Sequence, residues 1–102
     1  MGMMLTGRHI TAAEALRVGL VNEVVPGKDL LATAERWAGE IAECSPLSVQ
    51  ATKQAALGGL GRPLAEAMGA SYPAVQKLFS SEDVIEGPRA FAEKRKPVWR
   101  GP

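Results

Sequence analysis

Apolar residues recur at helical spacing in two long stretches of the chain, and Pro and Gly separate these stretches. The stronger pattern consists of Leu30, Ala34, Trp37, Ala38 and Ile41. These residues share one face of a helix, and Asp29 can cap its start after Pro26-Gly27. The second pattern consists of Leu64, Ala67, Met68, Val75, Leu78 and Phe79. It predicts a buried helical face, although Pro73 should kink or split the helix.

Residues with capping preferences mark the starts of two further helices. Thr11 and Glu14 form a capping box, so a short helix is expected from Ala12 to Val18, ended by Gly19 in the left-handed conformation. Ser45 before Pro46 combines a hydroxyl cap with a proline at the first helical position. A helix is therefore predicted from Pro46 to about Leu57.

The last part of the chain also reads as helical. Ser80 or Ser81 is expected to cap a start at which Glu82 and Asp83 suit the positive helix end. Gly87-Pro88 should separate a first turn or two from a final helix, Arg89 to Arg95, which Pro97 ends. Residues 98–102 show no interpretable pattern.

One segment has strand character. Residues 20–25 are rich in β-branched side chains and too short for a helix before Pro26, which predicts a short strand or extended segment. A strand needs a partner, and only the two or three residues around Arg8 to Ile10 offer one. The predicted fold class is therefore mainly α with one short strand segment.

Composition limits the functions that the chain can have. It has 102 residues, 46% of them hydrophobic, and a formal net charge of +1, which is typical of a globular domain without a strong field for nucleic acid or anionic membranes. One Cys and one His supply neither a disulfide nor a metal site. No apolar run is long enough to span a bilayer, and a cytoplasmic protein is expected. Basic residues cluster only between Arg89 and Arg100.

Five sequence pieces, taken in order, resemble the crotonase (enoyl-CoA hydratase/isomerase) family. They are Leu5-Thr6-Gly7-Arg8-His9-Ile10-Thr11-Ala12-Ala13-Glu14-Ala15 with Gly19 to Pro26, Ser45-Pro46-Leu47, Ala51-Thr52-Lys53, Leu78 to Asp83 with Glu86-Gly87, and Arg89 to Pro97. The resemblance covers about Leu5 to Trp99. It implies the C-terminal helical region of a crotonase-type fold, with the spiral β-β-α core absent and Met1 an internal residue of a longer protein.

The resemblance also carries expectations about function. Family members bind acyl-CoA, and their catalytic groups belong to the spiral core, so no catalytic residue is expected here. Two residues match a family stretch near the adenine and phosphate end of coenzyme A, contributed by a neighbouring subunit: Phe91 and Lys94. Because they lie three apart, they would share a helix face. Without the resemblance, Lys94, Arg95 and Lys96 read as a solvated helix end.

Other candidate residues have simpler interpretations. His9 has no partner in a recognisable catalytic arrangement, so it reads as a surface or packing residue rather than a general base. Cys44 has Glu43 and Ser45 as neighbours, which supply no positive charge to activate a thiol, so it reads as an inert cysteine. The acids Glu82 and Glu86 share a helix face, as acids in a first helical turn commonly do. Trp37 and Phe79 are expected to anchor the core or a subunit interface.

These observations lead to one hypothesis and one alternative. Residues 1–25 would link to the missing core, and residues 26–102 would form a helical trimerisation region. The parent would add water to 2-enoyl-CoA or isomerise it, with coenzyme A as part of the substrate, no separate cofactor and no metal. It would form a trimer or a dimer of trimers, and this chain alone would be inactive. The alternative is a non-catalytic helical module that binds a partner helix.

Overall fold

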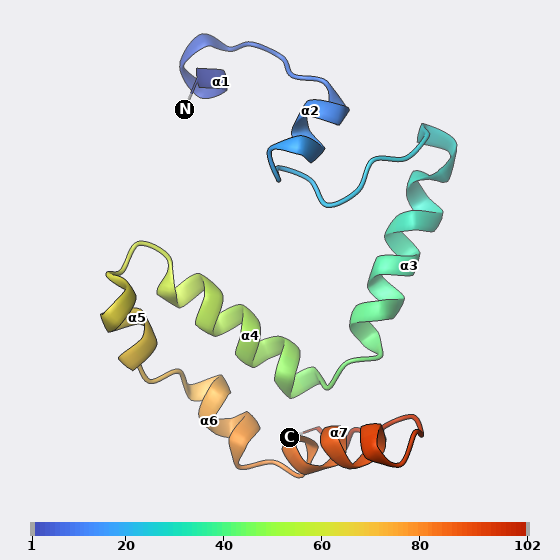
Figure 1. The fold of residues 1–102 in the computed structure, drawn as a ribbon, viewed down its shortest axis with the longest axis vertical. Coiled ribbons are helices and arrows are strands. Elements are labelled where there is room, and N and C mark those ends of the chain that lie inside the picture. Colours follow the sequence, from blue (N-terminus) through green and yellow to red (C-terminus); the bar gives the residue numbers. More distant parts are fainter. Residues whose placement is uncertain (1, 102) are drawn as a thin grey trace. The chain divides into compact units, whose positions relative to one another are not determined.

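The computed structural model describes residues 2–101, and all of its regular elements are helices (Figure 1). In chain order they are α1 (Gly2–Thr6), α2 (Ala12–Arg17), a 3₁₀ turn (Gly27–Asp29), α3 (Leu30–Ala42), α4 (Pro46–Gly59), α5 (Leu64–Gly69), α6 (Pro73–Phe79) and α7 (Asp83–Ala92). The predicted mainly α fold is confirmed. No helix within residues 2–101 is long and apolar enough to cross a membrane.

The predicted strand is not formed. Residues 20–25 have no helix or strand geometry, and neither do residues 8–10, which were the expected partner. A strand is defined by hydrogen bonds to a second strand, and the described chain supplies none. The β-branched residues therefore lie in an irregular connection, and the strand interpretation is wrong.

The chain divides into two compact units between Trp37 and Ala38, within α3. In the first unit, the Thr11 hydroxyl accepts a hydrogen bond from the Glu14 amide at 3.2 Å, as the capping pattern predicts. The Glu14 carboxylate does not return to the cap, because it pairs with Arg17 at 2.6 Å. Gly19 ends the helix with φ +74°, as expected. Ala15 is the buried residue of α2.

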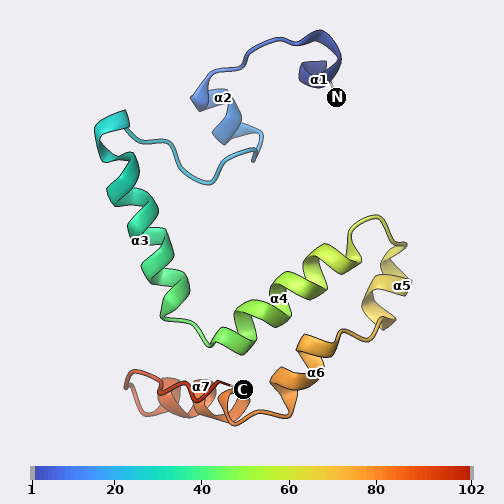
Figure 2. The same ribbon diagram turned by 180° about the vertical axis from the view of Figure 1, so that it is seen from behind.

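The second unit is built on the contact between α4 and α6, which lie side by side in Figures 1 and 2. Leu47 and Ala51 of α4 are buried, with 2% and 3% of their surface exposed. Gln54 of α4 accepts a hydrogen bond from the Ala74 amide of α6 at 2.8 Å. Pro73 starts α6 and separates it from α5, so the predicted break is a split and not a kink.

Three expectations for the last helix are wrong. The Ser80 and Ser81 hydroxyls bond back to carbonyl oxygens of α6 and cap nothing that follows. Helix α7 runs through Pro88 without a break, and it ends at Ala92 instead of Arg95. A proline restricts the preceding residue partly through that residue's Cβ, and Gly87 has none. The Gly-Pro pair is therefore compatible with a continuous helix.

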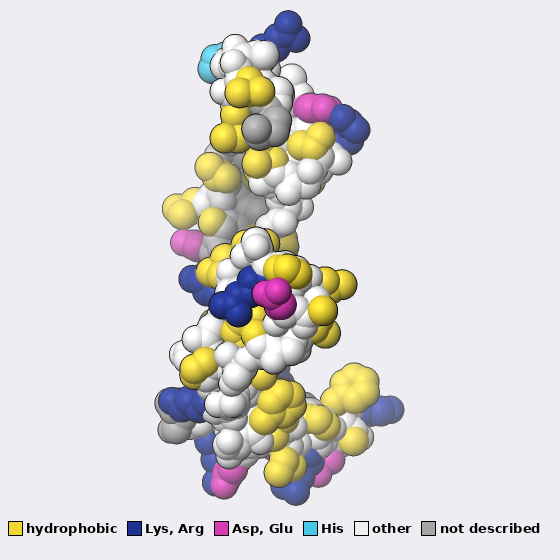
Figure 3. All heavy atoms as spheres, turned by 90° about the vertical axis from the view of Figure 1, so that its left-hand side faces the viewer, with side chains coloured by type: hydrophobic (Ala, Val, Ile, Leu, Met, Phe, Trp, Pro, Cys, Tyr) yellow, Lys and Arg dark blue, Asp and Glu magenta, His cyan; other side chains and the backbone are white. Residues whose placement is uncertain are grey.

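Much of the predicted apolar surface is uncovered (Figure 3). Leu64, Met68 and Phe79 are 77%, 79% and 69% exposed, so the prediction that they are buried is wrong in this chain. Trp37 is 37% exposed, and its indole donates to Glu23 at 2.8 Å. Core anchoring by Phe79 is excluded here, whereas a role in a subunit interface stays a prediction. The assignment of roles to residues 1–25 and 26–102 also stays a prediction.

Candidate functional site

The cations of the basic segment differ in their partners. Arg95 lies 2.5 Å from Glu86 and 2.6 Å from Glu93, Lys96 lies 3.4 Å from Glu43, and Arg100 lies 2.9 Å from Glu82. Lys94 forms no ion pair with any residue from 2 to 101. Its ammonium is therefore available to an external anion.

The two residues predicted to contact coenzyme A, Phe91 and Lys94, are joined by a backbone hydrogen bond at the end of α7. The Lys94 amide donates to the Phe91 carbonyl at 3.2 Å, and the Arg95 amide donates to the Ala90 carbonyl at 3.0 Å. These two bonds form a Schellman motif with Lys94 in its left-handed position, at φ +53°. Lys94 thus lies past the helix, and the predicted shared helix face is wrong. Phe91 is 88% exposed.

A left-handed conformation is unusual for lysine. Lys94 is the one residue other than glycine with positive φ among residues 2–101. A side chain with a Cβ adopts this conformation at a cost of about 1–2 kcal/mol, whereas glycine adopts it freely. The surrounding contacts must therefore hold this turn in place.

Asp83 is a buried carboxylate at the start of α7. It is 3% exposed, and its Oδ2 accepts from the Ser45 hydroxyl at 2.6 Å. Its Oδ1 accepts from the Arg100 amide at 2.9 Å. The Ser45 hydroxyl, followed by the Arg100 and Gly101 amides, lowers the Asp83 pKa. Asp83 thus links the start of α4 to the C-terminal segment.

Glu86, one turn further along α7, binds the same segment. Its two oxygens accept from Arg95 at 2.5 and 2.9 Å, and Oε1 also accepts from the Val98 amide at 2.8 Å. The Arg95 guanidinium and then the Val98 amide lower the Glu86 pKa to about 2, against an ordinary value of 4.5. In turn, the Glu86 carboxylate, followed by that of Glu93, raises the pKa of the Arg95 guanidinium above its ordinary value. The carboxylate therefore stays charged at neutral pH.

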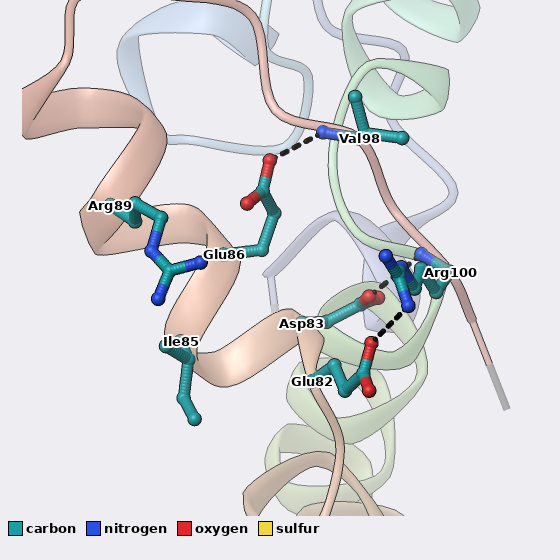
Figure 4. A pocket seen from close by; sticks show the side chains of 7 residues that line it. All are labelled: Glu82, Asp83, Ile85, Glu86, Arg89, Val98 and Arg100. Atoms are coloured by element: carbon teal, nitrogen blue, oxygen red, sulfur yellow. Dashed lines mark hydrogen bonds and ion pairs between the residues drawn. The ribbon is translucent and has the colours of Figure 1, made fainter.

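An open hollow of about 340 Å³ lies beside these carboxylates. Glu82, Asp83, Glu86, Arg89 and Arg100 line it, together with the apolar Ile85 and Val98 (Figure 4). Glu82 and Glu86 pair with Arg100 and Arg95, whereas Asp83 accepts hydrogen bonds from neutral donors, the Ser45 hydroxyl and the Arg100 amide. Two of the three carboxylates are thus bound by cations of the same C-terminal segment.

Trp99 anchors the tail that the sequence left uninterpreted. Its indole N–H donates to the Glu43 carbonyl at 2.8 Å. A Cβ at Gly87 would lie 3.5 Å from the Trp99 ring, so the ring packs directly against α7. Residues 96–101 are thus held along α7 by the Trp99 contact and by the Val98 and Arg100 amides, which donate to the carboxylates of Glu86 and Asp83.

The two remaining candidates, His9 and Cys44, lie on the surface. His9 is exposed, and the thiol of the exposed Cys44 donates to the Glu40 carbonyl at 3.5 Å. Within the described chain, no group of three or more His, Cys, Asp or Glu side chains is arranged to hold a metal.

Sequence reasoning missed the roles of Asp83, Glu86 and Trp99. It explained the acids by the helix dipole alone and gave Trp99 no role. One usable signal was present: Asp83 and Glu86 lie three apart, and a basic segment follows the helix that they begin. Long-range pairing of these acids with that segment could have been proposed from this arrangement.

Known proteins resemble this chain over nearly its whole length. Residues 1–102 match the family model described as enoyl-CoA hydratase/isomerase. (E)-Benzylidenesuccinyl-CoA hydratase of Thauera aromatica is 48% identical over 99% of this chain and 40% of its own length. Carnitinyl-CoA dehydratase of Salmonella typhi is 40% identical over 97% of this chain and 40% of its own length. The chain thus spans about 40% of these relatives.

Solved structures agree with the sequence matches. A protein of Novosphingobium aromaticivorans, assigned as a short-chain enoyl-CoA hydratase, superposes with a TM-score of 0.85 at 50% identity, covering 96% of this chain and 39% of that one. Enoyl-CoA hydratase of Bacillus anthracis gives a TM-score of 0.84 at 36% identity, covering 96% and 38%.

Proposed function

The chain belongs to the enoyl-CoA hydratase/isomerase family, and from this premise we propose that it forms part of an enzyme that acts on acyl-CoA thioesters. In that enzyme, Phe91 and Lys94 of one subunit contact the nucleotide end of the coenzyme A that is bound by a neighbouring subunit. The chain also supports assembly of the subunits into a trimer or a dimer of trimers. The whole enzyme adds water to 2-enoyl-CoA.

One observation carries the proposal for the contact. Lys94 occupies a strained turn three residues after the exposed Phe91, and no carboxylate within residues 2–101 pairs with it. The neighbouring cations Arg95, Lys96 and Arg100 all have acidic partners. A cation without an ion pair and an exposed aromatic ring, three residues apart in the sequence, suit a ligand that combines a phosphate with a planar base.

The chemistry of such a contact is simple. The Phe91 ring packs against the adenine, and the Lys94 ammonium pairs with a phosphate oxygen. An exposed ion pair contributes about 0.2–1 kcal/mol, which is at most about a fivefold change in affinity. Since the nucleotide is remote from the reacting carbons, this contact is equally strong in the ground and transition states.

The names of the relatives support a reaction that adds or removes water. One is a hydratase and the other a dehydratase, and both names specify a CoA thioester. Addition and elimination of water are the two directions of one reaction. The catalytic groups for that reaction are expected in the part of the relatives' length that this chain does not span.

A second candidate function is a helical module that binds a protein partner. The exposed apolar side chains of α3 and α5 favour it, among them Leu30, Ile41, Leu64 and Met68. The two candidates differ in whether coenzyme A is recognised, so a measurement of CoA thioester use separates them.

The test is steady-state kinetics of the full-length protein carrying this chain, with 2-enoyl-CoA as substrate. Lys94→Ala should raise KM about two- to fivefold at low salt, less at high salt, with kcat unchanged. Lys96→Ala is the matched control. It removes the same charge at a position two residues after Lys94, where the ammonium is already paired with Glu43. Arg95 is unsuitable as a control because it binds Glu86 and Glu93. Equal kinetics for both variants and wild type would remove the CoA role.

A further inference from the structure

One carboxylate on α7, that of Glu86, binds the segment that follows the turn at Lys94. Glu86 binds the guanidinium of Arg95, the residue directly after Lys94, and it binds the amide of Val98, three residues further on. Both partners lie on the C-terminal side of the turn, while the Schellman hydrogen bonds attach the turn to α7 itself. Glu86 therefore connects α7 directly to the segment that follows the turn.

The ion pair with Arg95 has the geometry of a stable clamp. Both carboxylate oxygens of Glu86 face separate guanidinium nitrogens, and the Glu86 side chain is only 16% exposed. Glu93 binds the remaining Arg95 Nε at 2.6 Å, and the Lys96 carbonyl accepts from Nη1 at 3.1 Å. The guanidinium is thus fixed by partners on both sides of the turn.

We infer that Glu86 is a positioning residue for Lys94: by binding Arg95 and the Val98 amide, it keeps the turn at Lys94 left-handed and the ammonium directed to the phosphate end of coenzyme A. The inference rests on the proposed function of Lys94. Glu86 itself does not touch the substrate in this proposal, and it acts through the backbone of residues 94–98.

The physical reason is the strain at Lys94. A lysine with positive φ returns to the right-handed or extended regions once the residues beside it are free to move. The Schellman bonds alone suffice for glycine at this position, but a residue with a Cβ needs further restraint. Loss of the Glu86 clamp would release the Val98 amide and leave Arg95 bound only to Glu93 and the Lys96 carbonyl, so that nothing would tie the turn back to α7 beyond its Schellman bonds. The Lys94 ammonium would then sample more directions.

The experiment compares wild type, Glu86→Gln, Lys94→Ala and the double variant in the full-length protein carrying this chain. Each is assayed with 2-enoyl-CoA and with the same acyl group on pantetheine, which lacks the nucleotide. Glu86→Gln should raise KM for the CoA thioester about two- to fivefold and leave kcat unchanged. The KM for the pantetheine thioester should not change, which a general loss of structure would not reproduce.

The double variant tests whether Glu86 acts through Lys94. If it does, Glu86→Gln should add nothing once Lys94 is already alanine, so the two effects should be non-additive. Hydrogen exchange at the Val98 amide should become faster in Glu86→Gln, because its acceptor is weakened. Arg95→Lys serves as a second variant that leaves α7 unaltered; it keeps the charge but loses the two-pronged geometry, and it should match Glu86→Gln.

The outcomes separate the two proposals. If Lys94→Ala raises KM while Glu86→Gln and Arg95→Lys do not, positioning by Glu86 is overturned and the proposed CoA contact stands. Additive effects in the double variant, or an equal rise in KM for the pantetheine thioester, also overturn positioning. If Lys94→Ala leaves KM unchanged, both the CoA contact and the positioning role fail.

Discussion

Gly19 and Lys94 occupy the same position of the same helix-ending motif. After α2, the Leu20 amide bonds to the Ala15 carbonyl at 2.8 Å and the Gly19 amide bonds to the Leu16 carbonyl at 3.1 Å; after α7, the corresponding bonds are made by Arg95 and Lys94. Both residues have positive φ, at +74° and +53°. The chain thus uses glycine where only the turn matters and lysine, at an energetic cost, at the predicted CoA contact.

Replacing Lys94 with glycine should therefore stabilise the chain and weaken its proposed function. The expected gain is about 1 kcal/mol, because glycine adopts the left-handed conformation without strain. Urea unfolding followed by circular dichroism measures this gain. KM for 2-enoyl-CoA in the full-length protein should rise as it does for Lys94→Ala. Gly19→Ala is the matched control and should destabilise; a Lys94→Gly variant less stable than wild type would contradict the strain.

Stability should depend on pH through Glu86. The folded-state pKa of Glu86 is about 2, below its ordinary value of 4.5, so the folded state binds the proton less tightly than the unfolded state does. The stabilisation is then fully present above pH 4.5 and is lost as the pH falls from 4.5 toward 2. Asp83 has a lowered pKa as well and acts in the same direction.

Thermal unfolding at a series of pH values tests this dependence. The midpoint should fall steeply below pH 4.5 in wild type, and the fall should be shallower in Glu86→Gln, which has no proton to bind at this position. Glu82→Gln is a suitable control, because that carboxylate is 70% exposed in its pair with Arg100. Identical pH profiles for wild type and Glu86→Gln would show that the pair with Arg95 is absent in solution.

The purified chain of 102 residues should not hydrate 2-enoyl-CoA. The catalytic groups are expected in the part of the relatives' length that this chain does not span, and Glu82 and Glu86 are bound here by Arg100 and Arg95. Loss of the conjugated thioester absorbance of crotonyl-CoA measures turnover. A rate above that of a buffer blank would show that catalytic groups are present in this chain after all.

The chain should also associate with itself or bind hydrophobic dyes. Exposed apolar side chains occur on α3, α5 and α6, and monomers rarely tolerate large apolar patches. Analytical ultracentrifugation over a range of concentrations gives the association state. Met68→Glu on the exposed face of α5 should reduce association, whereas Thr52→Glu on α4 adds the same charge on a polar position and should not. A monodisperse wild-type monomer without dye binding would contradict this prediction.

The sequence predicted what local chemistry determines. The caps at Thr11 and Ser45, the glycine end at Gly19 and the break before Pro73 depend on neighbouring residues, and all four are confirmed. The contacts of Asp83, Glu86 and Trp99 join residues that lie 9 to 56 positions apart, and no local pattern specifies them. The prediction that Leu64 and Met68 are buried was wrong, because an apolar pattern identifies the apolar face of a helix but not the element that would cover it.

The Gly87-Pro88 pair offers the last prediction, because sequence reasoning placed a helix break there and the structure places none. A Gly-to-Ala change inside a helix normally stabilises by about 1 kcal/mol. Before a proline, however, the added Cβ clashes with the proline ring when the backbone is helical. The same Cβ would lie 3.5 Å from the Trp99 ring, which is an ordinary contact and should have little effect.

Whether Gly87→Ala raises or lowers the free energy of unfolding should therefore depend on the residue at position 88. In wild type the change should destabilise α7, whereas in a Pro88→Ala background it should stabilise by about 1 kcal/mol. The difference is the interaction free energy of a double-mutant cycle, measured by urea unfolding of the four proteins. Equal effects of Gly87→Ala in both backgrounds would show that the missing Cβ of Gly87 is not what allows α7 to continue through Pro88.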